Sequence, residues 1–108
     1  MHLKFEKNRI RYHVSKIEAL ELLKVGHISD QANFPSGHTL TFRVETTESN
    51  ENKTKYADST LTFLITHDTV ERLVQKPTKE GVIFLQDKVA YSFEIDMREE
   101  RRKRIRKI

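Results

Sequence analysis

Apolar and polar residues alternate with period two at the start of the chain, which is typical of β-strands with one buried face. One set of alternating positions is apolar: Leu3, Phe5, Ile10, Tyr12 and Val14. The pattern predicts two short strands joined at Lys7-Asn8, because Asn adopts a positive φ at low cost. The other face of this hairpin carries His2, Lys4, Glu6, Arg9, Arg11 and His13. We therefore expect a hairpin with one apolar and one mostly basic face.

A helix is predicted to begin after Ser15. Ser15 and Glu18 have the spacing of a capping box, in which the hydroxyl and the carboxylate each satisfy a backbone N–H. Gly26 is placed to follow the last turn, where φ is often positive. The expected buried stripe consists of Ile17, Leu20 and Leu23 with the neighbouring Ala19 and Leu22.

Two further strands are expected in the first half. Residues 28–34 form a weak strand pattern, and Leu40, Phe42 and Val44 form a clear one, with Pro35-Ser36-Gly37 as the turn between them. Residues 46–54 are polar throughout and are predicted to be a loop.

The second half repeats this pattern. A shift of 51 residues aligns Tyr12 with Phe63, Ser15 with Thr66 and Phe42 with Phe93 without a gap. The pattern predicts a strand over 60–65, a helix capped by Thr66 that ends before Pro77, and a hairpin of 82–85 and 89–95 that turns at 86–88. The similarity has two explanations: a duplication, or the chance likeness of amphipathic elements of the same type.

Each half therefore predicts a strand-strand-helix-strand-strand unit. Half a chain is too short to bury much apolar surface alone, so the two units are expected to share one core. We predict one α+β domain over residues 1–96, with an internal pseudo-repeat of 1–46 and 52–96. The two units would form one antiparallel sheet or a partly closed barrel with two helices. Residues 97–108 would form a basic C-terminal tail.

Three stretches resemble a known family: residues 1–15, 34–42 and 56–62, with the sequences MHLKFEKNRIRYHVS, FPSGHTLTF and YADSTLT. The resemblance is to small uncharacterised bacterial proteins, a domain of unknown function. Their basic-apolar N-terminal hairpin has the form M-K-I-R-I-x-x-N-S-I-R, and here Arg9 replaces the usual Ser. The resemblance implies the fold and no activity, cofactor or catalytic residue, and it does not extend to the basic tail.

The charge of the chain is concentrated at its C-terminal end. The 108 residues include 20 basic and 16 acidic ones, for a formal net charge of +4. Seven of the basic residues and three of the acidic ones lie within residues 96–108, so residues 1–95 hold 13 of each. The body is neutral, and the excess positive charge belongs to the tail.

Several classes of chemistry find no support in the sequence. The chain has no Cys, which excludes disulfides, thiol catalysis and zinc-thiolate sites. His2 and His13 are expected to be neighbours on the hairpin, but the five histidines include no pair at the helical spacing of zinc ligands. Glycine-rich phosphate loops and serine nucleophile motifs are also missing. Glu94 and Asp96 are expected to pair with Arg98 or Arg101 rather than to catalyse. We expect no cofactor, and the sequence favours a protein that is not an enzyme.

The basic tail is the strongest functional signal. It would neutralise phosphates and bind polyanions in a salt-dependent way, helped by the hairpin. The residues predicted to contact nucleic acid are Arg98, Arg101, Arg102, Lys103, Arg104, Arg106, Lys107, Arg9 and Arg11. One alternative is a protein-interaction or homo-oligomeric module that docks a sheet edge or the tail on an acidic partner. A less favoured alternative is an enzyme, which would need a pocket enclosing polar side chains from both halves. Without an export signal or an apolar run of spanning length, the chain is expected to be cytoplasmic and not to bind membranes.

Overall fold

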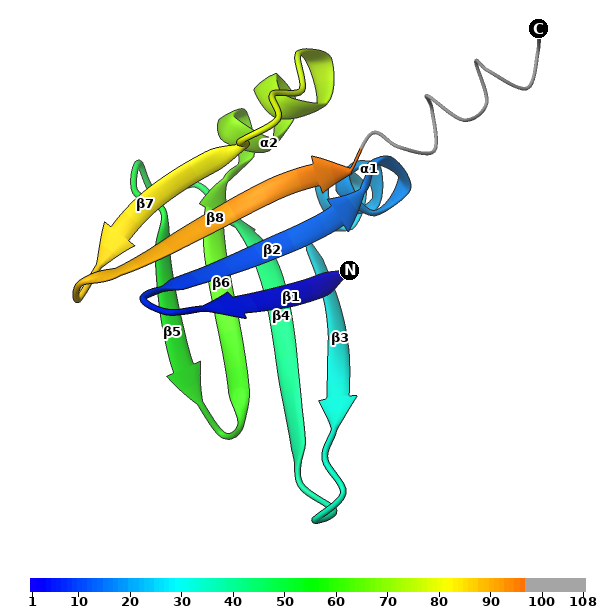
Figure 1. Cartoon of the computed structure of the whole chain (residues 1–108). Helices are drawn as coiled ribbons and strands as arrows, with labels where there is room; N and C mark the ends of the chain where they lie inside the picture. Colours follow the sequence, from blue (N-terminus) through cyan, green and yellow to red (C-terminus); the bar gives the residue numbers. More distant parts are fainter. Residues whose placement is uncertain (97–108) are drawn as a thin grey trace, which may run out of the picture.

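The computed structural model describes residues 1–96, which form eight strands and two helices (Figure 1). In chain order these are β1 (His2–Glu6), β2 (Arg9–Ser15), α1 (Lys16–Val25), β3 (His27–Asn33), β4 (Thr39–Thr47), β5 (Lys53–Ala57), β6 (Thr60–Thr66), α2 (His67–Gln75), β7 (Val82–Gln86) and β8 (Val89–Asp96). The α+β class is confirmed, and the order strand-strand-helix-strand-strand occurs twice.

The strands form two separate four-stranded sheets. Sheet 1 has the order β1-β2-β8-β7, and sheet 2 has the order β3-β4-β6-β5. In each sheet two antiparallel hairpins meet along a parallel central pair, β2 with β8 and β4 with β6. The prediction of one antiparallel sheet or a partly closed barrel is therefore wrong. The turn residues in the sequence predict only the four hairpins. The parallel pairs join strands that no turn connects, so the sequence contains no signal for them.

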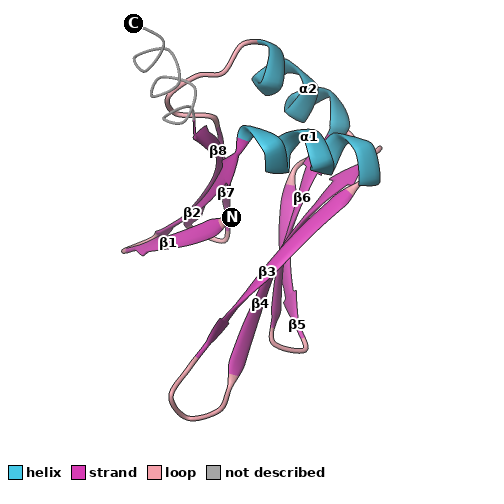
Figure 2. Ribbon diagram, turned by 90° about the vertical axis from the view of Figure 1, so that its right-hand side faces the viewer, coloured by secondary structure: helices cyan, strands magenta, loops and turns pink. Residues whose placement is uncertain are grey.

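The helices explain how the hairpins are shared between the sheets. Helix α1 carries the chain from β2 in sheet 1 to β3 in sheet 2, and α2 carries it back from β6 to β7. Both helices lie at one end of the molecule, where the two sheets approach each other, and the sheets diverge away from them (Figure 2). Each sheet thus contains one hairpin from each half of the chain. No helix of this described part is long and apolar enough to cross a membrane.

The core lies between the inner faces of the two sheets and beneath the helices. At its centre the ring of Phe63 lies 5.1 Å from that of Tyr12, 5.3 Å from that of Phe84 and 6.2 Å from that of Phe93. The Tyr12 hydroxyl donates to the backbone oxygen of Leu61 at 3.3 Å. Burial raises the pKa of Tyr12, so this hydroxyl remains a donor at neutral pH. Both halves contribute to this one cluster of buried side chains.

The predicted ends of α1 are confirmed. The Ser15 hydroxyl accepts from the backbone N–H of Glu18 at 3.0 Å, and the Glu18 carboxylate accepts from the N–H of Ser15 at 2.9 Å, which completes the capping box. Gly26 follows the helix with a φ of 95°, in the left-handed region. The predicted stripe is partly wrong, because Ile17 is 70% and Leu20 is 46% exposed. The helix instead buries Ala19 and Leu22, with Leu23 packed beside them. Positions 19, 22 and 23 follow the helical spacing on one face, whereas 17 and 20 lie on the next.

The gapless alignment of the two halves does not hold through the last hairpin. Tyr12 pairs with Phe93 in sheet 1, and its counterpart Phe63 pairs with Val44 in sheet 2. Phe93 therefore takes the place of Val44 rather than of Phe42. The two halves differ here because six residues connect α2 to β7, whereas Gly26 alone connects α1 to β3. Duplication of an ancestral unit stays a prediction.

Candidate functional site

The outer face of sheet 1 carries the basic residues predicted for the first hairpin. Three cross-strand pairs share this face: His2 with His13, Lys4 with Arg11, and Glu6 with Arg9. The rings of His2 and His13 are stacked with centroids 4.8 Å apart, as expected for neighbouring histidines on this face. Alternation along β1 and β2 places these side chains opposite the core-facing Leu3, Tyr12 and Val14.

Strand β8 adds a buried carboxylate to this face. Glu94 pairs with His13 in the β2–β8 register and is 5% exposed. Arg11 binds it with two hydrogen bonds, from Nε to Oε2 at 2.8 Å and from Nη2 to Oε1 at 2.8 Å. The hydroxyl of Ser92 donates to Oε2 at 2.9 Å. Two parallel N–H donors on one carboxylate form a strong and directional contact.

This contact fixes the charge of both partners. The hydrogen bonds from Arg11 hold the pKa of Glu94 below its usual value, although burial alone would raise it. Glu94 and Glu6 raise the pKa of Arg11, and Nη1 of Arg11 donates to Oε1 of Glu6 at 3.0 Å. All three guanidinium nitrogens of Arg11 therefore bind carboxylates. We infer that Arg11 organises the face and has less capacity for an external anion than its exposure suggests.

Two further basic side chains, Arg9 and His13, lie near Glu94 without a full hydrogen bond. Nη2 of Arg9 is 3.9 Å from Oε2, and Nε2 of His13 is 3.9 Å from Oε1. Within the described residues, Nε of Arg9 and Nε2 of His13 are buried nitrogens that have no hydrogen-bond partner. Burial lowers the pKa of His13, so its ring is mainly neutral at pH 7. The face thus holds two buried nitrogens whose hydrogen-bonding capacity no described residue meets.

Part of this face, including Arg11, His13 and Glu94, lines a cleft of about 500 Å³. The first half of the chain contributes its wall on β1 and β2, and the second half contributes β8 and the segment before β7. The lining residues are His2, Lys4, Arg11, His13, Pro77, Thr78, Lys79, Glu94, Ile95 and Asp96. A smaller pocket of about 130 Å³ adjoins it and shares His2, His13 and Asp96. Polar side chains from both halves therefore meet in one cleft.

The structure places the predicted site residues unequally. Arg9 and Arg11 lie together on the outer face of sheet 1, as the hairpin pattern predicted. Arg98, Arg101, Arg102, Lys103, Arg104, Arg106 and Lys107 lie outside the described residues. Arg98 and Arg101 were also expected to pair with Glu94, and this expectation lies outside the described residues as well. Among the described residues, Glu94 binds Arg11. Lys79 also lines the cleft, although no sequence pattern marks it. It lies in the α2–β7 connection, which reaches the first hairpin only through the parallel β2–β8 pair.

The cleft presents the charged and polar groups of Lys4, Arg11, Lys79 and Glu94 with two imidazoles. Glu94 is held ionised by Arg11 and cannot donate a proton at neutral pH. His13 is the one imidazole of the cleft that lies close to this carboxylate. No group of three metal-ligating side chains is present within residues 1–96.

The comparisons with known proteins agree with the resemblance noted in the sequence. Residues 1–98 match a family model described as a family of unknown function (DUF7009). The search of curated proteins found no match to the chain. The match covers all eight strands and both helices, and therefore the whole cleft.

Proposed function

We propose that this chain, which belongs to a family of unknown function (DUF7009), binds the phosphates of a nucleic acid with its cleft and its basic tail. The observation that carries the proposal is the parallel pairing of β2 with β8. This pairing brings Asp96, from which the basic tail continues, into the same cleft as Lys4, Arg11 and Lys79. The tail therefore starts at a surface that already presents cations.

The charges of the described face support a division of roles. Lys4 and Lys79 supply positive charge at the cleft, while Glu6 and Glu94 largely neutralise Arg11. The described part alone is close to charge balance, so the seven basic residues of the tail supply most of the attraction. The cleft then adds a fixed site at which Lys4 and Lys79 meet phosphate oxygens.

The first test is binding of the full chain to a mixed-sequence RNA and to a mixed-sequence DNA. Affinity should fall steeply between about 50 mM and about 200 mM salt, because each neutralised phosphate releases counterions. A chain that ends at Asp96 should bind at least about 100-fold more weakly at the lower salt concentration. Equal affinity of the two chains would rule out a role of the tail in binding. If neither chain binds, the proposal is overturned in favour of an acidic protein partner.

The second test separates the cleft from general charge. Lys55 occupies on β5 the place that Lys4 occupies on β1, 51 residues earlier. Lys4→Gln should weaken binding more than Lys55→Gln, although both remove one positive charge. Equal effects of the two substitutions would show that the cleft takes no part in binding.

A further inference from the structure

The two sheets leave four strands at their edges, and each edge exposes a row of backbone N–H and C=O groups. These strands are β1 and β7 in sheet 1, and β3 and β5 in sheet 2. An exposed edge is a template for pairing with another chain, and proteins usually prevent this with charged side chains on the edge strand. The four edges can therefore be compared for such protection.

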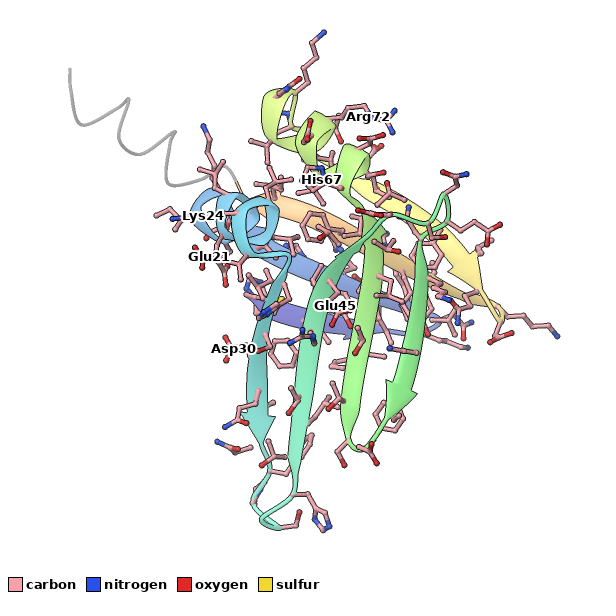
Figure 3. All side chains as sticks on the ribbon, turned by 180° about the vertical axis from the view of Figure 1, so that it is seen from behind. Glu21, Lys24, Asp30, Glu45, His67 and Arg72 are labelled. Carbon is pink, nitrogen blue, oxygen red and sulfur yellow. The ribbon has the colours of Figure 1, made fainter. Side chains whose placement is uncertain are left out.

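Three of the edges carry charge. Strand β1 contains Lys4 and Glu6, and β5 contains Lys53 and Lys55. Strand β3 contains Asp30, which pairs with the core residue Phe42 and is itself exposed (Figure 3). A charge at such a position disfavours the burial that a further strand would bring.

Strand β7 differs from the other three. Its five residues, Val82–Gln86, carry no charge and no proline. Ile83 and Leu85 pair with Ser92 and Ala90, which places them on the outer face, where they are 49% and 75% exposed. β7 lies at the free side of sheet 1 in Figure 1, and within the described part of the chain β8 is the strand that pairs with it.

The side chain of Gln86 makes the contrast with β5 sharper. Its Nε2 donates to the backbone oxygen of Thr54 at 2.9 Å, and its Oε1 accepts from the N–H of Thr54 at 2.8 Å. These bonds satisfy a backbone donor and acceptor at the β5 edge. The neighbouring β7 edge has no such cover among the described residues. An uncharged, apolar edge without cover indicates a place where a strand is added.

We propose that β7 pairs with β7 of a second copy of this chain, antiparallel and centred on Phe84, to join two copies of sheet 1 into one eight-stranded sheet. This register sets Ile83 opposite Leu85 of the second copy, and Leu85 opposite its Ile83, on the outer face. The exposed apolar side chains then cover each other.

The charges around β7 favour a second copy over a charged partner. Lys79 and Glu80 precede the strand, and Asp87 and Lys88 follow it, so each end is neutral. Two-fold antiparallel pairing brings the leading end of one strand to the trailing end of the other, where Glu80 faces the end that carries Lys88. An acidic or basic peptide would find no complementary charge on β7 itself. The inference is independent of the nucleic-acid proposal, because the cleft residues lie on β1, β2 and β8 and on the segment before β7.

The mass of the full chain in solution tests the inference. Sedimentation equilibrium from about 1 µM to about 1 mM should show a monomer–dimer equilibrium, as expected for a small interface. Ile83→Lys with Leu85→Lys should raise the dissociation constant at least tenfold. The matched control is Ile17→Lys with Leu20→Lys on α1, which also replaces two exposed apolar side chains and should leave dimerisation unchanged. A monomer throughout, or equal effects of the two variants, would overturn the inference.

Cross-linking tests the register without relying on the lysine variants. Since the chain has no cysteine, Ile83→Cys and Leu85→Cys chains each carry a single thiol. A mixture of the two should form disulfide-linked dimers faster than either chain alone, because positions 83 and 85 face each other across the proposed pair. A mixture of Ile17→Cys and Leu20→Cys chains supplies the control. Equal rates for the mixture and for the separate chains would contradict the register.

Discussion

The two sheets share one plan and differ on their outer faces. Both have a parallel central pair flanked by antiparallel edge strands. In both, a glutamate of one central strand lies on the outer face: Glu94 of β8 opposite His13 in sheet 1, and Glu45 of β4 opposite Leu64 in sheet 2. Arg11 of sheet 1 has Thr62 as its counterpart, so Glu45 has no cross-strand arginine and instead pairs with Arg43 of its own strand at 2.7 Å.

This difference separates what builds the fold from what builds the cleft. The inner positions of the central strands are largely apolar in both sheets, since both must cover the same core. The outer positions are free of that requirement, and sheet 1 alone uses them to bury a carboxylate among cations. The charged cluster is therefore an addition to a scaffold that sheet 2 forms without it.

The largest effect is expected from breaking the cluster. Arg11→Met leaves Glu94 buried without its two strong donors and should lower the free energy of unfolding by about 3 kcal/mol. The matched change in sheet 2, Arg43→Met, breaks a pair whose side chains are 30% and 34% exposed. It should cost less than about 1 kcal/mol. Urea unfolding of both variants measures the difference, and equal costs would show that the two outer faces do not differ in energy.

A smaller, pH-dependent effect is expected from Glu94→Gln. The folded pKa of Glu94 lies below its usual value of 4.5, so the unfolded state takes up the proton first as the pH falls. Its contribution to stability is therefore full above pH 4.5 and is lost as the pH falls through the folded pKa.

The Glu94→Gln variant should be about 2 kcal/mol less stable than the natural sequence at pH 7. The two stability curves should converge as the pH is lowered below 4.5, the usual pKa of the group. Urea unfolding between pH 7 and pH 3 measures this convergence. A constant difference over the whole range would mean that the pKa of Glu94 is the same in the folded and the unfolded protein.

The smallest effects compare the two helix caps. Ser15 makes a complete capping box, whereas the Thr66 hydroxyl accepts from the N–H of Thr69 at 3.3 Å without a returning carboxylate. Ser15→Ala should cost about 1 kcal/mol, and Thr66→Ala about half of that. Thermal unfolding of the two variants resolves the order, and a larger cost at Thr66 would contradict it.

The local elements could be predicted from the sequence because their signals are local. The Asn8 turn, the Ser15 cap, the Gly26 terminus and the turn at Asp87-Lys88 all have the positive φ or the capping bonds expected of them. The sheet organisation could not be predicted in this way. The pairing of β2 with β8 joins residues from opposite ends of the chain, and neither strand contains a signal for its partner.

The candidate site was predictable in its cations and not in its carboxylate. Alternation placed Arg9, Arg11 and the two histidines on one face, which the structure confirms. Glu94 was expected to pair with the residues that follow it in the chain. Its real partner comes from a strand more than 80 residues earlier, and only the parallel register brings them together.

The parallel pairs also indicate the order in which the two sheets form during folding. In sheet 2, Thr41 pairs with Thr60, 19 residues later, whereas in sheet 1 Arg9 pairs with Ala90, 81 residues later. Closing the longer loop costs more chain entropy, and contacts of high sequence separation form slowly. During synthesis, β3 to β6 can assemble before β8, the strand that pairs with β2, has been made. The cleft is then the last part of the molecule to form, so that a chain interrupted before β8 would have the four strands of sheet 2 and an incomplete cleft.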